Sequence, residues 1–321
     1  MKTAIIGASG AIGQTIVRTL VSRGQKVRLV GRSEHKLKAA FGNLEAEYIT
    51  ADVTDRNGCL EALGDAEAAV YTLGLPYTKK AFALYPIMMH TMVDAAAQSG
   101  LKKLVLITNV YPYGAPQTDR VEETHPRSAP AVKAQYRKEQ EDILLAAHNP
   151  SGLKTLSLRL PDFYGPDSEL SLVHEVFKAA VNCKKANLLG PIDTPHEFMY
   201  TPDVGPVAVD LLEKDEAFGT AYNFAGPGTM SMRQFAEAVF AEAGCDKPKL
   251  VVAQGVLLRL LGVVVPLLRE LVEMEYLLKT PVILDDKKLH AVLGSVHKTS
   301  YADGIKQTVA AYKQREGSPT G

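Results

Sequence analysis

Positive and negative charges cancel in this chain, which has 36 lysines and arginines and 36 aspartates and glutamates. A protein that binds nucleic acid usually carries an excess of positive charge, so the composition gives no support to that class of function. Only three cysteines, Cys59, Cys183 and Cys245, are scattered over the 321 residues. They are too few and too far apart to predict a disulfide framework or a metal site, and they favour a cytoplasmic location.

Uninterrupted apolar runs are short as well. The most membrane-like stretch, residues 256–278, contains two arginines, a proline and several glutamates, so we expect no membrane span. Two buried helices that break at Pro266 are expected there, with a membrane-surface or partner-binding helix as the alternative. Glycines near the start and a missing cleavage region argue against a signal peptide, and residues 317–321 are expected to be disordered.

A glycine-rich segment lies directly after the apolar run at residues 3–6. Its sequence, Gly-Ala-Ser-Gly-Ala-Ile-Gly at residues 7–13, predicts a strand that turns at once into a helix. Gly7 permits the tight turn, Gly10 lets the backbone approach a diphosphate, and Gly13 lets the helix pack closely on the sheet. The free N–H groups of the first helical turn would face the anion, so the segment predicts a dinucleotide site.

Strand and helix patterns alternate through the first half of the chain. Strands are expected near residues 2–6, 26–30, 45–49, 68–73, 103–108 and 154–160, with helical segments between them. Such alternation predicts an α/β fold with a doubly wound parallel sheet that is covered on both faces. Ligands then bind at the carboxyl ends of the strands.

The regular alternation weakens after Pro161. Shorter elements follow, including a helix expected to start at Ser231, with Gln234 completing a capping box. We expect a dinucleotide-binding domain over residues 1–165. Residues 166–321 are expected to form mainly a smaller substrate-binding lobe, from which some segments return to the first domain.

The residue after the second strand bears on the choice of dinucleotide. Arg32 stands there, and a guanidinium accommodates a 2′-phosphate, whereas an acidic residue would bind a free ribose hydroxyl. NADP(H) is therefore favoured, NAD(H) stays possible, and Arg32 could instead stack on adenine or be solvated. After the third strand, Asp52 and Val53 are placed to contact the adenine, although Asp52 could equally cap the helix that begins near Asp55.

Several motifs together resemble a known family. After the glycine loop come Asp-Val-Thr-Asp at residues 52–55, the segment 110–114, Arg-Leu-Pro-Asp-Phe-Tyr-Gly-Pro at 159–166, Tyr-Thr-Pro-Asp-Val at 200–204 and Tyr-Asn-Phe at 222–224. This order is similar to that of extended short-chain dehydrogenases/reductases, and the chain resembles the NAD-dependent epimerase/dehydratase family along nearly its whole length. The resemblance implies a Rossmann domain, a C-terminal substrate lobe, and hydride chemistry on a sugar nucleotide or another hydroxyl or carbonyl compound. With the glycine loop, it gives the expected cofactor contacts: Gly7, Ser9, Gly10, Ala11, Ile12, Gly13, Arg32, Asp52, Val53, Leu73, Gly74, Thr108 and Pro161.

The catalytic positions depart from that family. Its members carry Ser or Thr after the fifth strand and a Tyr-x-x-x-Lys pair on the following helix. Alignment on residues 141–144 places Lys133 at the tyrosine position and Arg137 at the lysine position, and Asn109 stands where the serine would be. Tyr136 is not expected to replace the tyrosine, because the residue four positions later is a glutamine. The departure resembles atypical members of the superfamily.

Other side chains could supply the missing proton. We hypothesise that Lys133 donates it and that Arg137 holds the ribose; the alternative is that both only bind phosphate or ribose. Tyr111 is a second candidate donor, and Asn109 completes the candidate catalytic set. His196 and Glu197 could reach the substrate but are expected to be solvated loop residues.

The sequence leaves two kinds of function open. The first is an oxidoreductase or epimerase that acts on a small-molecule substrate, and the second is a non-catalytic NADP(H) sensor that signals through a partner. Two copies could pair through helices around residues 84–99 and 131–148. The side chains of Tyr85, Met88, Met89 and Met92 would then lie between the copies, or alternatively fill the core.

Overall fold

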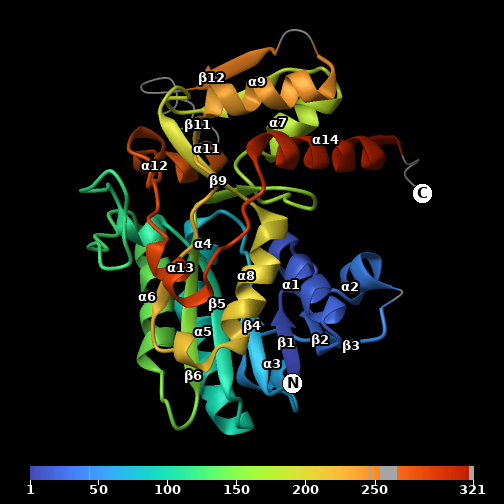
Figure 1. Cartoon of the computed structure of the whole chain (residues 1–321), viewed down its shortest axis with the longest axis vertical. Coiled ribbons are helices and arrows are strands. Elements are labelled where there is room, and N and C mark those ends of the chain that lie inside the picture. Colours follow the sequence, from blue (N-terminus) through green and yellow to red (C-terminus); the bar gives the residue numbers. More distant parts are fainter. Residues whose placement is uncertain (43, 246–247, 254–265, 318–321) are drawn as a thin grey trace.

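The computed structural model describes residues 1–42, 44–245, 248–253 and 266–317. A larger lobe holds the amino terminus and a smaller lobe lies above it in Figure 1. The helix pair expected around Pro266 falls partly outside the described residues, as does most of the tail expected to be disordered. The part that is described begins with α11 (Pro266–Val272).

Seven parallel strands form the sheet of the larger lobe, in the order β10-β6-β5-β4-β1-β2-β3. The chain reverses its direction across the sheet between β1 and β4, which confirms the predicted doubly wound fold. The strands are β1 (Lys2–Ile6), β2 (Lys26–Gly31), β3 (Glu47–Thr50), β4 (Ala68–Tyr71), β5 (Lys103–Asn109), β6 (Lys154–Leu160) and β10 (Ala221–Asn223). A crevice for a ligand is expected at the carboxyl edge beside this reversal.

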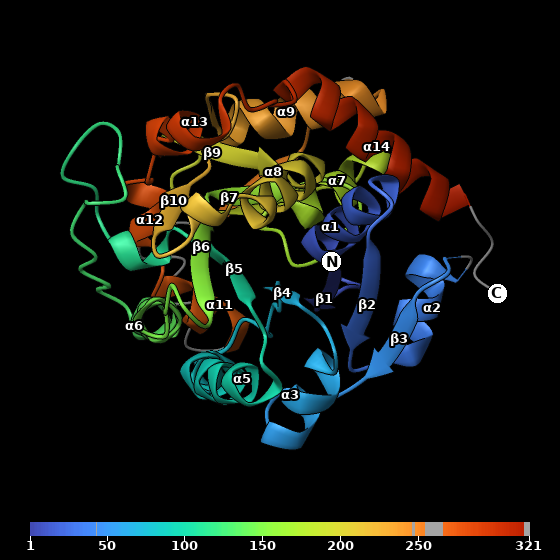
Figure 2. The same ribbon diagram turned by 60° about the horizontal axis from the view of Figure 1, so that its bottom comes forward.

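Helices cover both faces of this sheet (Figure 2). Alternate residues of one strand point to opposite faces, so Val105 packs with one helical layer and Leu106 with the other. The first layer contains α1 (Ala11–Ser22), α2 (Glu34–Phe41), α8 (Thr201–Glu213) and α13 (Lys287–Leu293). The second contains α3 (Arg56–Leu63), α5 (Leu84–Ser99) and α6 (Val132–Ala146).

The apolar side chains of α5 fill the core of the second layer. Met88, Met89 and Met92 are at most 3% exposed, and Tyr85 is 4% exposed. These four residues therefore take the core alternative of the two that the sequence left open.

The smaller lobe is built on a three-stranded sheet in the order β11-β9-β7. Its strands are β7 (Asp162–Tyr164), β9 (Pro195–Tyr200) and β11 (Thr229–Ser231), and β8 (Ala186–Leu189) pairs separately with β12 (Leu250–Ala253). Aromatic side chains form much of the core between this sheet and helices α7 (His174–Val181), α9 (Met232–Ala243) and α14 (Tyr301–Gly317). The predicted capping box at Ser231 and Gln234 is confirmed at the start of α9.

A disulfide joins Cys183 to Cys245, whose Cα atoms lie 5.8 Å apart. The expectation that none of the cysteines pairs is therefore wrong for these two, while Cys59 is free and buried. The partners are 62 residues apart in sequence. Because they meet only through the packing of α7 on α9, no local pattern could reveal them.

Asp203 connects two segments of the chain at the start of α8. The N-cap residue is Tyr200, and Asp203 lies in the first turn of the helix. Its carboxylate accepts hydrogen bonds from the backbone N–H and the hydroxyl of Thr299, both at 2.7 Å. Asp203 thus fastens the segment before α14 to α8.

Across the described ranges, no helix is long and apolar enough to span a membrane.

Candidate functional site

The glycine loop between β1 and α1 forms a cradle of main-chain N–H groups. Gly7 has a φ of +92°, which favours glycine, and a Cβ at Gly13 would collide with the carbonyl oxygen of Gly7. Gly10 is the N-cap of α1 and offers no side chain to the first helical turn. The N–H groups there remain free for an anion, so the loop fits a dinucleotide diphosphate.

A pocket beside this loop has the form of an adenosine site. It lies between the carboxyl ends of β1, β2, β3 and β4, and apolar side chains of α5 close one side. Its lining residues are Ile6, Gly7, Val30, Gly31, Arg32, Ala51, Asp52, Val53, Thr54, Leu73, Leu75, Leu84 and Met88. The structure thus brings together the expected contacts Gly7, Arg32, Asp52, Val53 and Leu73. The others, Ser9, Gly10, Ala11, Ile12, Gly13, Gly74, Thr108 and Pro161, lie at or after the carboxyl ends of β1, β4, β5 and β6.

Two aspartates after β3 take the two roles that the sequence left open, which are the capping of α3 and contact with the adenine. Asp55 is the N-cap of α3 and accepts a hydrogen bond from the N–H of Gly58 at 2.9 Å. Asp52 instead accepts from the N–H of Thr54 at 3.0 Å, and this bond holds the pKa of Asp52 below its usual range. Its ionised carboxylate therefore faces the pocket and does not cap the helix.

Arg32 lies exposed at the edge of the same pocket. Its positive charge contributes to the lowered pKa of Asp52, after the hydrogen bonds from Thr54. In the part of the chain that the structure describes, no ion pair engages the guanidinium. Such a side chain can accept a phosphate bidentately.

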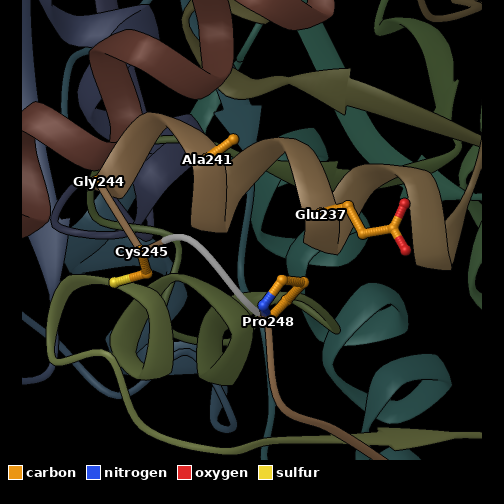
Figure 3. Close-up of a pocket in the computed structure, with 5 residues that line it drawn as sticks. All are labelled: Glu237, Ala241, Gly244, Cys245 and Pro248. Carbon is orange, nitrogen blue, oxygen red and sulfur yellow. The ribbon is translucent and has the colours of Figure 1, made fainter.

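Another hollow in the described surface lies far from this crevice, beside the disulfide of the smaller lobe. Figure 3 shows its lining residues on and after α9, namely Glu237, Ala241, Gly244, Cys245 and Pro248. None of the predicted cofactor or catalytic residues lies there. The crevice at the carboxyl edge of the large sheet is therefore the candidate site.

Lys133 on α6 is buried in an ion-paired cluster. Its ammonium lies 2.6 Å from an oxygen of Glu270 and 2.9 Å from an oxygen of Glu273. The same nitrogen stands 5.3 Å from the ring centre of Tyr77. Although burial opposes ionisation, the ammonium holds the pKa of Glu273 below its usual range. Two of the three N–H donors of Lys133 are thus used by carboxylates.

Arg137 lies one turn further along α6 and reaches the carboxyl end of β5. Its guanidinium donates to the hydroxyl of Thr108 at 2.9 Å and to the side chain of Gln140 at 2.7 Å. The Cζ atom of the guanidinium lies 4.3 Å from the ring centre of Tyr85. Its Nε is buried and has no protein partner among the described residues. A cofactor hydroxyl at this position would satisfy that donor.

Tyr111 and Asn109 follow the end of β5. The side-chain oxygen of Asn109 accepts from the N–H of Tyr111 at 3.2 Å, and the Tyr111 hydroxyl shares a hydrogen bond with Tyr77. Burial raises the pKa of Tyr111 well above its ordinary value, and the nearby Arg137 opposes this only in part. Tyr276 donates to the Tyr111 carbonyl at 3.1 Å. These contacts fix Tyr111 as a protonated hydroxyl.

Tyr113, in contrast, is a structural residue. It is 1% exposed, donates to the side chain of Asn223 at 2.7 Å and accepts from Arg159 at 2.6 Å. Arg159 also pairs with the fully buried Glu141 at 2.8 Å. This network joins β6, β10 and α6 beneath the site.

Asp162 and His196 form a pair that the sequence did not reveal. The imidazole Nε2 lies 2.7 Å from a carboxylate oxygen, and the side chains are 8% and 22% exposed for His196 and Asp162 respectively. His196 is therefore not a solvated loop residue, because β9 carries it into the interior. The position of Asp162 directly after the sixth strand was the available signal. Its partner depends on the pairing of β7 with β9, which no local pattern reveals.

Glu197, the next residue on β9, is also buried and not solvated as expected. It is 2% exposed and accepts a hydrogen bond from the N–H of Leu284 at 3.0 Å. Burial raises the pKa of Glu197 to about 8. This hydrogen bond and the nearby cations lower the pKa, but their effect is smaller than that of burial. Glu197 therefore belongs to the interior of the smaller lobe.

Comparisons with known proteins agree with this geometry. A family model described as NAD(P)H-binding matches residues 7–169. The 3 beta-hydroxysteroid dehydrogenase/Delta 5-->4-isomerase of Mycobacterium tuberculosis is 21% identical over 266 residues, which span 78% of this chain and 71% of that protein. The UDP-glucose 4-epimerase of Bacillus subtilis is 23% identical over 241 residues, which span 69% of this chain and 65% of that protein.

A solved structure shares the fold over almost the whole chain. It is the dTDP-glucose 4,6-dehydratase from Streptomyces venezuelae, determined with NAD bound. The TM-score is 0.82 at 17% sequence identity, and the match covers 99% of this chain and 98% of that one. At this low identity, the likeness establishes the architecture.

Proposed function

The chain belongs to the NAD(P)H-binding family, and on this premise we propose that it is an extended short-chain dehydrogenase/reductase that transfers a hydride between a pyridine nucleotide and its substrate. The substrate would be a small hydroxyl or carbonyl compound or a sugar nucleotide. The proposal is carried by one observation. The adenosine pocket, the glycine cradle and the pair formed by Arg137 and Thr108 lie in this order along one carboxyl edge, the order in which adenosine, diphosphate and nicotinamide ribose follow in a dinucleotide.

Each part of the crevice would hold one part of the cofactor. The N–H groups after Gly10 would bind the diphosphate, Asp52 and Val53 the adenine, and Arg137 the ribose of the nicotinamide. When bound, the nicotinamide supplies or accepts the hydride. NADP(H) is favoured over NAD(H), because the exposed Arg32 lies where a 2′-phosphate would be bound.

Lys133 is the proposed proton donor. Glu270 and Glu273 hold its ammonium in place and leave one N–H for the substrate oxygen. The side chains of both carboxylates are 25% exposed. They could therefore pass a proton from solvent to Lys133 after it has donated its own. Tyr111 would donate to the same oxygen, and Asn109 orients Tyr111 through its backbone N–H.

The direct test is the oxidation of NADPH by the purified protein in the presence of a panel of carbonyl compounds. Turnover with at least one compound, and none with a Gly13→Val variant, supports the proposal. Tight binding of NADPH without oxidation by any compound would contradict hydride transfer.

A second candidate function is supported by the same cluster. At the position where the family carries its proton donor, Lys133 is tied to two carboxylates, which suits a redox sensor that binds NADP(H) and signals through a partner. A sensor would bind NADPH and NADP+ with different affinities and would not oxidise NADPH. Calorimetry with both forms, beside the oxidation assay, separates the two functions.

We also propose a cytoplasmic location and a homodimer. The exposed side of α5 carries Ile87, which is 54% exposed and could pair two copies. Light scattering of the wild type and an Ile87→Asp variant tests this, since a dimer should dissociate in the variant. The disulfide between Cys183 and Cys245 counts against that location, because a cytoplasmic protein would keep the pair reduced. Thiol trapping in intact cells tests the location, because a fully oxidised pair would contradict it.

A further inference from the structure

The substrate end of the crevice carries an excess of negative charge around Lys133. One ammonium faces the two carboxylates of Glu270 and Glu273, so the cluster as a whole is anionic. Arg137 adds a cation that donates one hydrogen bond each to the neutral side chains of Thr108 and Gln140, and its buried Nε faces the proposed ribose site. Lys133, which two carboxylates hold, and Arg137, which the proposed cofactor would engage, are therefore not free to bind a diphosphate group of a substrate.

Asp162 adds a further carboxylate near Tyr77 and Tyr111. Its charge contributes to the raised pKa values of both Tyr77 and Tyr111, after the larger effect of their burial. Its partner His196 leaves the pair anionic when the imidazole is neutral and uncharged when it is protonated. Neither state provides the positive charge that an anionic substrate needs.

The polar groups that remain for the substrate are uncharged hydroxyls. Burial keeps Tyr77 and Tyr111 protonated at physiological pH, and they are linked to each other by a hydrogen bond. A carbonyl or alcohol oxygen can bind to such hydroxyls without any net charge.

Apolar side chains lie in and beside the adenosine pocket. Leu75 and Leu84 line the pocket, and Leu84 is 38% exposed. Leu170, from the segment after β7, stands close to Gly74, since a Cβ on that glycine would lie 3.0 Å from its side chain. Leu170 is 68% exposed and its neighbour Leu172 is 36% exposed. Exposed apolar side chains gathered at a crevice typically mark a binding surface.

We propose that the substrate is an uncharged ketone, aldehyde or secondary alcohol with a hydrocarbon body, and not a nucleoside diphosphate sugar. Its oxygen lies among Lys133, Tyr77 and Tyr111, and its apolar body lies along Leu170. This inference rests on the proposed function, whose range of substrates it narrows.

Binding to the NADP+-loaded protein tests the inference without requiring turnover. The probes are an oxodecalin carboxylate, its methyl ester and UDP-glucose, titrated by calorimetry. The two oxodecalins share one skeleton and differ in charge. We expect the ester to bind at least about tenfold more tightly than the carboxylate, and UDP-glucose to bind more weakly than the ester.

Asp162→Asn isolates the contribution of charge, because the amide oxygen can still accept a hydrogen bond from His196. The preference for the ester should fall at least about threefold in this variant. The matched control is Asp215→Asn. Asp215 pairs with Lys103 and Lys154 at the amino ends of β5 and β6, which lie away from the crevice. Replacement of Asp215 should therefore leave the preference for the ester unchanged.

Leu170→Ser tests the apolar surface. The ester should bind about threefold to tenfold more weakly, since a leucine side chain buries enough apolar area for such a change. Val251→Ser is the control, because Val251 is 48% exposed on β12, which belongs to the smaller lobe away from the crevice.

The outcomes separate this inference from the proposed function. Tighter binding of the ester that depends on Asp162 and Leu170 supports the substrate class, whether or not the compound is reduced. UDP-glucose binding as tightly as the ester, or an ester that does not bind, overturns it. Binding of the ester without any oxidation of NADPH by it or by other ketones would contradict hydride transfer alone.

Discussion

The ammonium of Lys133 on α6 lies 2.6 Å from a carboxylate oxygen of Glu270 on α11, 137 residues further along the chain. Glu270 also accepts a hydrogen bond from the backbone N–H of Lys79 at 2.9 Å, at the first residue of α4 (Lys79–Phe82). One carboxylate therefore ties three segments together over the substrate end of the crevice. The shape of the proposed reaction site depends on this contact.

Lys133→Arg should separate proton donation from charge. The arginine keeps a cation near Glu270 and Glu273, but it holds its proton too firmly to give it up. If Lys133 donates the proton, kcat should fall by a factor of roughly 10²–10⁴. A variant that turns over at the wild-type rate would show that Lys133 only binds and positions.

Lys133→Met should destabilise the protein, because two carboxylates lose their partner. Breaking a fully buried pair costs about 3–5 kcal/mol; we expect about 2–3 kcal/mol here because each carboxylate retains some contact with solvent. Urea unfolding of this variant and of Lys138→Met measures the difference. Lys138 pairs with Asp142 on the exposed side of the same helix, so its replacement should cost less than about 1 kcal/mol.

Replacement of the glycines in the dinucleotide loop should give graded effects. Gly13→Ala places a Cβ against backbone atoms of Gly7 and Ala8, whereas a Cβ at Gly10 would lie 3.3 Å from the carbonyl oxygen of Gly7. We expect Gly13→Ala to lower the free energy of unfolding by about 1–3 kcal/mol and to abolish measurable NADPH binding. Gly10→Ala should bind NADPH more weakly but remain folded. Equal NADPH affinities in both variants and the wild type would contradict the proposed cradle.

Arg32→Ala should change the preference between the two dinucleotides. Loss of a guanidinium that grips a 2′-phosphate should weaken NADPH binding about tenfold to a hundredfold and leave NADH nearly unaffected. Lys38→Ala is the control, because Lys38 is exposed and pairs with Glu34 on α2. If both nucleotides weaken equally in Arg32→Ala, the arginine contacts a part that they share, such as the adenine.

Glu197 should make stability depend on pH. Its pKa is about 8 in the folded protein, against an ordinary value of 4.5, so the folded state binds the extra proton between these limits. The associated stability is fully present below pH 4.5 and is lost as the pH rises through about 8, with a slope of at most about 1.4 kcal/mol per pH unit. Glu197→Gln should remove this slope. Parallel pH profiles of unfolding for the wild type and the variant would contradict the assignment.

Much of the larger lobe follows from short-range sequence patterns. The apolar run of β5 and the glycines before α1 specify both the strands and the edge at which a dinucleotide binds, and the structure has these elements where the patterns predict them. β10 was not predicted, because its three residues, Ala221–Asn223, are too few to show the alternation of a strand. Its place in the sheet comes from pairing with β6.

The substrate end of the site could be predicted only in part. Lys133, Arg137, Asn109 and Tyr111 are candidates because they replace or adjoin family positions near one strand and one helix. Their partners come from distant segments, and no local pattern indicates that Glu270 meets Lys133 or that His196 meets Asp162. The same is true of the disulfide, which depends on the packing of two helices in the smaller lobe.

Calorimetric titration of the purified protein with NADPH and NADH tests the central claim most directly. The glycine cradle and the adenosine pocket predict one site per chain, tighter binding of NADPH, and a corresponding rise in melting temperature. Heat of binding should disappear in Gly13→Val. If the folded wild-type protein binds neither nucleotide, the crevice is not a dinucleotide site and the proposed function is wrong.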